Sequence, residues 1–147
     1  MNRARLDRLL RDTSRSGVFR ASSLIMRELH ATAEAAGFAT VRIDLGTAGN
    51  KTELIERLAT ALVFPDWFGR NWDGLADCLG DLSWLPAAGY LILIEHCDDF
   101  HARLGEDFAI ALQVFAEAAD AWRDARVPFW VLVDAHADGL SFLPDVG

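Results

Sequence analysis

The spacing of apolar residues along the chain predicts an alternation of strands and helices. Segments in which apolar residues alternate with polar ones, or run together, are typical of strands. They lie at 17–20, 38–45, 90–95 and 128–134. Segments whose apolar residues recur every three or four positions are typical of helices with one buried face. They lie at 3–11, at 22–36, after Asn50, at 71–82 and at 106–126.

The order of these elements favours an α/β fold. Strands that alternate with helices form parallel sheets with right-handed helical crossovers. The segments at 90–95 and 128–134 are apolar almost throughout, as in strands covered by helices on both faces. We therefore expect a small, mostly parallel sheet of three to four strands packed with helices. In the helix at 22–36 the predicted buried face holds Leu24, Ile25, Leu29 and Ala33.

The start of the chain differs from the rest in composition. It predicts a short amphipathic helix followed by a Ser/Gly break, and the first 20 residues contain six arginines and two aspartates. We expect residues 1–16 to form a basic helical extension and residues 17–147 to form the α/β domain. A chain of 147 residues that is 52% hydrophobic is long enough for one such domain with a sizeable core.

The formal net charge of −8 narrows the class of partner. The first 20 residues carry a net positive charge, so the net charge of the rest of the chain is more negative than −8. An acidic surface attracts basic proteins and speeds their association, whereas binding to phosphates requires clustered Lys and Arg. The composition therefore predicts a basic protein partner and no direct contact with nucleic acid.

The sequence also predicts the cellular location of the protein. It contains no apolar run of the roughly 20 residues that a membrane helix needs, and its start lacks the apolar stretch of a secretory signal. Two cysteines, Cys78 and Cys97, are too few for a disulfide framework. These features predict a cytoplasmic protein with reduced cysteines and no membrane partner.

One predicted helix, which begins after Asn71, has an exposed acidic side. Asn71 is suited to the N-cap, and Asp73 in the first turn gains from the helix dipole. Asp77 has no such local reason, because like charges four residues apart repel each other by a few tenths of a kcal/mol. At about 100° per residue both carboxylates lie opposite the apolar stripe. The small residues Gly74 and Ala76 between them are expected to let a partner approach closely.

Aromatic residues precede this helix. Trp67, Phe68 and Trp72 lie in or beside a loop that contains Gly69. Aromatic side chains beside charges are typical of the residues that dominate the binding energy of protein interfaces. The same patterns also suit an acidic face that is merely solvated and aromatic residues that belong to the core. Composition and spacing alone leave both interpretations open.

Residues 64–79, FPDWFGRNWDGLADCL, resemble the loop and acidic helix of the barstar family, intracellular inhibitors of a secreted bacterial ribonuclease. ALQVFAEA at 111–118 is similar to a later helix of the family, and YLILIE and FWVLV follow the order of its strands. The resemblance extends over residues 41–133. It implies a barstar-like α/β fold and a ribonuclease inhibitor with an immunity or antitoxin role, which is not an enzyme and needs no cofactor.

The resemblance also implies roles for individual residues. Asp77 matches the carboxylate that enters the nuclease active site where a substrate phosphate would lie, and Asp73 matches one that pairs with nuclease arginines. Trp67 matches an aromatic anchor, Asn71 the helix cap and Glu117 an acidic contact on the later helix. The expected partner-binding set is Asp73, Asp77, Trp67, Asn71, Trp72, Gly69, Ala76 and Glu117.

Two positions depart from the family's pattern. The prototype has a tryptophan where Ala76 stands and a leucine where Trp72 stands. These departures alter the surface that would meet a nuclease. They favour an alternative, a barstar-like regulatory module that binds a protein without inhibiting a nuclease.

Other groups of polar residues indicate neither an enzyme nor a metal site. Asp73 and Asp77 would act as acid and base only in a cleft that separates their pKa values, and a convex helix face provides none. The segment 96–99 with His101 lacks the spacing of known metal sites. Adjacent His96 and Cys97 on a strand would point to opposite faces, so they form no nucleophile pair. We interpret this segment as a polar turn at the end of a strand.

Overall fold

The computed structural model describes residues 3–135 and 143, which form helices and strands in alternation. The strands are β1 (Val18–Arg20), β2 (Ala39–Asp44), β3 (Tyr90–Glu95) and β4 (Phe129–Val133). The helices are α1 (Arg3–Arg11), the 3-10 turn η1 (Thr13–Arg15), α2 (Ser23–Ala35), α3 (Lys51–Ala61), α4 (Trp72–Asp81), α5 (Cys97–Arg103) and α6 (Gly105–Asp124).

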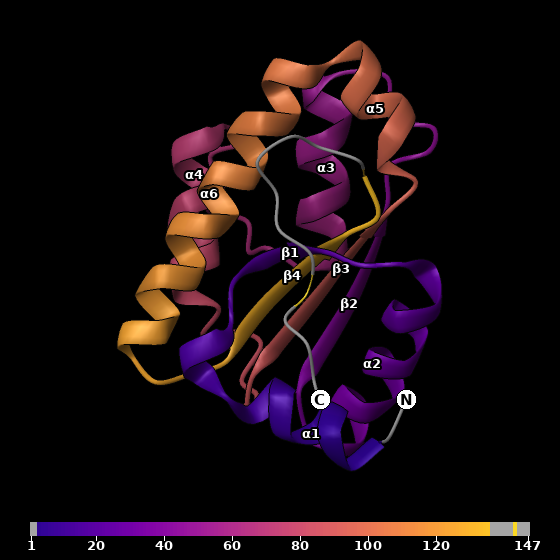
Figure 1. Ribbon diagram of the computed structural model, residues 1–147. Helices are drawn as coiled ribbons and strands as arrows, with labels where there is room; N and C mark the ends of the chain where they lie inside the picture. The colour runs from indigo at the N-terminus through magenta and orange to yellow at the C-terminus, as the bar shows by residue number, and fades with distance from the viewer. Residues whose placement is uncertain (1–2, 136–142, 144–147) are drawn as a thin grey trace.

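The strands form one parallel sheet of four, in the order β1-β4-β3-β2 (Figure 1). β3 pairs with β2 over six residues, from Tyr90 opposite Ala39 to Glu95 opposite Asp44. The short β1 lies at the other edge, where it pairs with β4. The α/β class and the small, mostly parallel sheet that the sequence predicts are thus confirmed, and every pairing is parallel.

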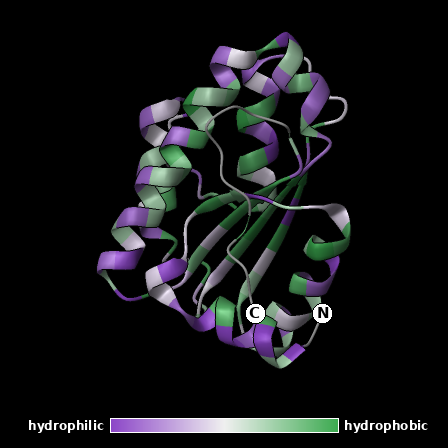
Figure 2. Cartoon of the chain, in the orientation of Figure 1, coloured by the Kyte–Doolittle hydropathy of each residue, from purple (hydrophilic) through white to green (hydrophobic). Residues whose placement is uncertain are grey.

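Helices cover both faces of this sheet (Figure 1). Leu91 and Leu93 of β3 pack with α1 and α2, whereas Ile92 and Ile94 pack with α3, α4, α5 and α6. Successive side chains of a strand point to opposite faces, so one apolar strand supplies both clusters. Figure 2 shows the hydrophobic strands enclosed between the two helical layers.

The N-terminal helix packs on the sheet. Leu6, Leu9 and Leu10 of α1 are buried in the cluster that α2 shares with β3 and β4. The indole Nε1 of Trp130 in β4 donates a hydrogen bond to the carbonyl of Leu10 at 3.0 Å. The division of the chain at residue 16 remains a prediction, but α1 contributes to the packing of the α/β core.

Two local predictions are wrong. The segment predicted as a polar turn after β3 begins α5, because the carboxylate of Asp134 accepts hydrogen bonds from the backbone N–H groups of His96 and Cys97. Leu24, predicted on the buried face of α2, is 66% exposed, and Met26 is buried in that helix instead.

Within the part of the chain that the structure describes, we find no helix with both the length and the apolar character needed to cross a membrane.

The packing of α1 can be tested by shortening a buried leucine. Leu9→Ala should lower the free energy of unfolding by about 2–5 kcal/mol, because it leaves a cavity beneath α1. Leu24→Ala, the same change at an exposed position of α2, should alter it by less than about 0.5 kcal/mol. Urea denaturation measures both values. Equal, small effects of the two variants would contradict the observed packing of α1.

Candidate partner-binding site

The predicted N-cap of α4 is confirmed. Asn71 has an extended backbone, and its side-chain oxygen accepts a hydrogen bond from the N–H of Gly74 at 2.6 Å. This bond satisfies one of the free N–H groups that begin a helix. Asp73 lies in the first turn, where the helix dipole favours a carboxylate.

The two sides of α4 differ in exposure as the helical period predicts. Leu75, Cys78 and Leu79 are buried against the core, whereas Asp73 and Asp77 are exposed. The indole of Trp122 in α6 donates a hydrogen bond to the carbonyl of Leu79 at 2.8 Å and ties the two helices together. The carboxylates are therefore presented on a helix whose other side is fixed.

Cys78 is a core residue of α4. Burial raises the pKa of its thiol, and the nearby carboxylates of Asp77 and Asp81 raise that pKa further. The thiol therefore stays neutral at physiological pH, beneath the acidic side of the helix.

Gly74 does not lie on the exposed side of α4, where the sequence analysis expected it to let a partner approach. It is buried, and a Cβ there would lie 3.1 Å from the backbone N of Gly69 and 3.2 Å from Cδ1 of Phe68. The residue thus lets the preceding loop pack against α4 and does not flatten the exposed side. Ala76, which lies between the two aspartates in the sequence, is exposed, and its small side chain projects little from the helix surface.

The aromatic residues at the start of α4 and in the loop before it differ in exposure, since one ring is largely exposed and the others are half-buried. Phe64 packs against Phe68 and Trp84, with ring centroids 4.9 Å and 6.0 Å away. Trp67 contacts Trp84 edge-on, with centroids 5.9 Å apart, and remains 58% exposed. Trp72 is half-buried beneath the ammonium of Lys51, which lies 5.2 Å from its ring centroid.

The remaining expected residues are exposed. Gly69 lies at the surface of the loop, and its neighbour Arg70 forms an ion pair with Glu56 of α3. Glu117 is exposed on α6 and accepts a hydrogen bond from Gln113 at 3.4 Å. Because α6 packs beside α4, the structure brings three carboxylates onto two neighbouring helices (Figure 1).

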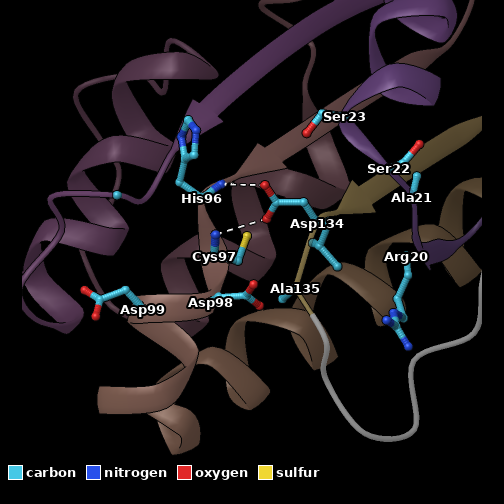
Figure 3. A pocket seen from close by; sticks show the side chains of 12 residues that line it. Arg20, Ala21, Ser22, Ser23, His96, Cys97, Asp98, Asp99, Asp134 and Ala135 are labelled. Atoms are coloured by element: carbon cyan, nitrogen blue, oxygen red, sulfur yellow. Dashed lines mark hydrogen bonds between the residues drawn. The ribbon is translucent and has the colours of Figure 1, made fainter.

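A cavity that we did not predict lies at the carboxyl ends of the strands (Figure 3). Its volume is about 550 Å³, and its lining includes Arg20, Ser22, His96 and Asp134. The first residues of α2 and α5 flank it on either side of Asp134. Ligands of α/β proteins often bind in such crevices, because the loops after parallel strands converge there. The order of strands and helices is the signal that could have located it.

The side chains of this cavity do not form a nucleophilic pair. Cys97 is buried, its Sγ donates to the carbonyl of Ile94 at 3.3 Å, and burial raises the pKa of its thiol. His96 instead bonds through Nδ1 to the carboxylate of Asp44 at 3.0 Å. This contact raises the pKa of His96, while hydrogen bonds from Gly46 and His96 lower that of Asp44. Among the described residues, no three His, Cys, Asp or Glu side chains are placed to hold a metal ion.

Residues 38–134 match the family model described as "Barstar (barnase inhibitor)". The matched segment contains β2, β3, β4 and the whole acidic helix. No curated protein matches the chain.

The solved structures that are similar in fold include that of the ORC2 protein of Aeropyrum pernix in ADPNP-ADP complexes, with a TM-score of 0.56 and 14% sequence identity. The similarity covers 95% of this chain and 40% of that one. At this identity the likeness shows a shared fold and nothing about function.

The two glycines of α4 provide a matched test of the loop packing. Gly74→Ala should destabilise the protein by about 1–3 kcal/mol, because the new methyl group crowds the loop backbone. Gly80→Ala should stabilise it by about 0.5–1 kcal/mol, because no atom lies within 4 Å of a Cβ there. Thermal or urea unfolding measures both. Stabilisation by Gly74→Ala would show that the loop does not pack on α4.

Proposed function

Because the chain belongs to the barstar family, we propose that it inhibits a ribonuclease by placing the carboxylates of α4 in the enzyme's cationic active site. The observation that carries this proposal is the exposure of Asp73 and Asp77 on the side of α4 opposite its buried stripe. Carboxylates and phosphates bind the same cationic side chains, so these two groups would occupy the place of an RNA phosphate. Glu117 on the neighbouring α6 would add a third carboxylate.

The distribution of charge supports a cationic partner at α4. The chain has a net charge of −8, and the arginine-rich α1 lies on the opposite face of the sheet from α4. Arg70, in the loop before α4, is paired with Glu56. A partner that approaches α4 therefore meets a field that attracts cations and speeds its association.

The fixed geometry of α4 supports tight binding. The cap at Asn71 and the hydrogen bond from Trp122 order the helix before any partner arrives. Association then loses little conformational entropy on this side of the interface. Asp73 and Asp77 repel each other in the free protein, and a cation placed between them would remove that repulsion.

The proposed role is that of an immunity or antitoxin protein. It would act in the cytoplasm, where a bound inhibitor protects the cell from a ribonuclease made there. Inhibition would need only contact between two proteins, with no cofactor and no reaction on this chain.

A regulatory module that binds a protein without inhibiting a nuclease is the second candidate. Ala76 supports it, because its exposed methyl group offers little contact area where the family prototype has a tryptophan. Trp72 supports it too, since this ring, half-buried beneath Lys51, replaces a leucine. Both changes alter the shape of the surface but leave the carboxylates exposed.

The first test is a titration of ribonuclease activity. Barnase and any ribonuclease encoded beside the gene are mixed with increasing protein, and cleavage of a fluorescent RNA is followed. Wild type should abolish the activity of its target at equal concentrations. Asp77→Asn should weaken inhibition by about 100-fold or more, because breaking a buried ion pair costs about 3–5 kcal/mol.

Glu34→Gln is the matched control for this change. Glu34 is exposed on α2, on the other face of the sheet, and the substitution alters the net charge by the same amount. It should leave inhibition within about threefold of wild type. If wild type inhibits no ribonuclease, or Asp77→Asn inhibits as well as wild type, the proposed function is wrong.

The salt dependence of the kinetics tests the electrostatic part of the proposal. Raising the salt from about 0.05 M to about 0.5 M shortens the range of the protein's field severalfold. The association rate constant should fall by about tenfold or more, and the dissociation rate constant should change less. Stopped-flow fluorescence measures the first and surface plasmon resonance the second. An association rate that is independent of salt would contradict attraction by the acidic surface.

A further inference from the structure

Among the residues that the structure describes, three helices end with the same backbone geometry. After each one the chain turns through a residue with a positive φ: Gly37 after α2 (82°), Val63 after α3 (54°) and Arg126 after α6 (63°). In each case the N–H of that residue bonds to the carbonyl three residues before it, and the next N–H bonds to the carbonyl five residues before its own position. The six bonds are Gly37 N to Glu34 O, Phe38 N to Ala33 O, Val63 N to Thr60 O, Phe64 N to Ala59 O, Arg126 N to Arg123 O and Val127 N to Trp122 O. This is the Schellman motif.

Val63 is the least suitable residue for this position. Glycine is preferred there, since an L side chain in the left-handed region brings its Cβ too close to the following carbonyl oxygen. A β-branched residue is the most restricted, and its presence at positive φ is rare. Burial does not compensate, because the side chain is 64% exposed. Gly37, in the same motif at the end of α2, shows that the fold accommodates glycine in this geometry.

The position of Val63 connects it with the acidic helix. The carbonyl of Leu62 accepts a hydrogen bond from the indole of Trp84 at 3.0 Å, and the ring of Phe64 packs against the same indole. Val63 is therefore held between two residues that Trp84 anchors. Trp67, further along this loop, also contacts Trp84 and is also largely exposed.

The same loop continues onto α4. Phe68, which follows Trp67, packs so closely against Gly74 that a Cβ there would crowd its ring. Asp73 is the neighbour of Gly74 and carries one of the exposed carboxylates. The loop that leads into α4 thus exposes two apolar side chains, those of Val63 and Trp67. Apolar residues that lie near charged ones are typical of interfaces.

We propose that Val63 is an apolar contact of the α4 interface, and that its strained backbone is retained because the bound ribonuclease buries its isopropyl group. This inference rests on the proposed inhibition. The surface of the enzyme that receives Val63 and Trp67 would be apolar and would adjoin the cationic site that receives Asp73. Val63 then exchanges stability of the free protein for affinity in the complex.

Two substitutions at Val63 test this exchange with the ribonuclease that the titration identifies. Val63→Gly should raise the melting temperature by about 3 °C, because glycine relieves the strain, and should weaken inhibition by about tenfold. Val63→Asn should also weaken inhibition by about tenfold, because asparagine tolerates the left-handed conformation but lacks the apolar group. Agreement between the two variants excludes added loop flexibility as the cause. Calorimetry measures the melting temperature, and inhibition at equilibrium measures the affinity.

Arg126→Gly is the matched control. It relieves the same backbone geometry at the end of α6, so it should raise the melting temperature without weakening inhibition. Val63→Gly that inhibits as tightly as wild type, or that lowers the melting temperature, would overturn the inference. If that outcome is found while Asp77→Asn abolishes inhibition in the same experiment, the proposed function stands and the inference about Val63 alone is wrong. If wild type inhibits no ribonuclease, both proposals are wrong.

Discussion

Burial of β3 and β4 on both faces is the constraint on which the rest of the structure depends. Consecutive residues of each strand enter different hydrophobic clusters, so Leu91 packs towards α1 and α2 while Ile92 packs towards α3–α6. Neither strand has a side that water could cover at low cost, and both helical layers are therefore required. The arginine-rich α1 belongs to one layer and the acidic α4 to the other. The same packing thus separates the two signs of charge.

The acidic side of α4 illustrates how a rigid fold can hold an arrangement that a free helix would disfavour. Asp73 and Asp77 repel each other, but Asn71 caps the helix and Trp122 ties it to α6. The packing of the other side supplies far more stability than the repulsion removes. The fold can then hold both carboxylates in position for a cationic surface. When such a surface binds, its cations attract both carboxylates and offset the repulsion between them. This is the physical basis of the proposed inhibition.

Two departures from local preference lie near this helix. Other helix ends follow the usual rules, since Ser22 and Asn50 cap α2 and α3 and Gly37 ends α2, although Arg126 occupies a left-handed position after α6. At α4 and the loop before it, by contrast, like charges adjoin and Val63 occupies a left-handed position. Local rules tend to be broken where function requires it, and stability is recovered elsewhere. Both departures lie on the surface where we place the partner.

The sequence by itself determined the α/β class, most helices and strands, the cap at Asn71 and the exposed side that carries Asp73 and Asp77. These features follow from apolar periodicity and capping residues, which can be recognised within a single segment of the sequence. Tertiary structure alone decided that α5 forms, since Asp134 caps it from 37 residues away. It also decided that Gly74 is buried against the loop and that Leu24 is exposed. Each of these outcomes depends on which elements touch, and the spacing of residues within one element does not contain that information.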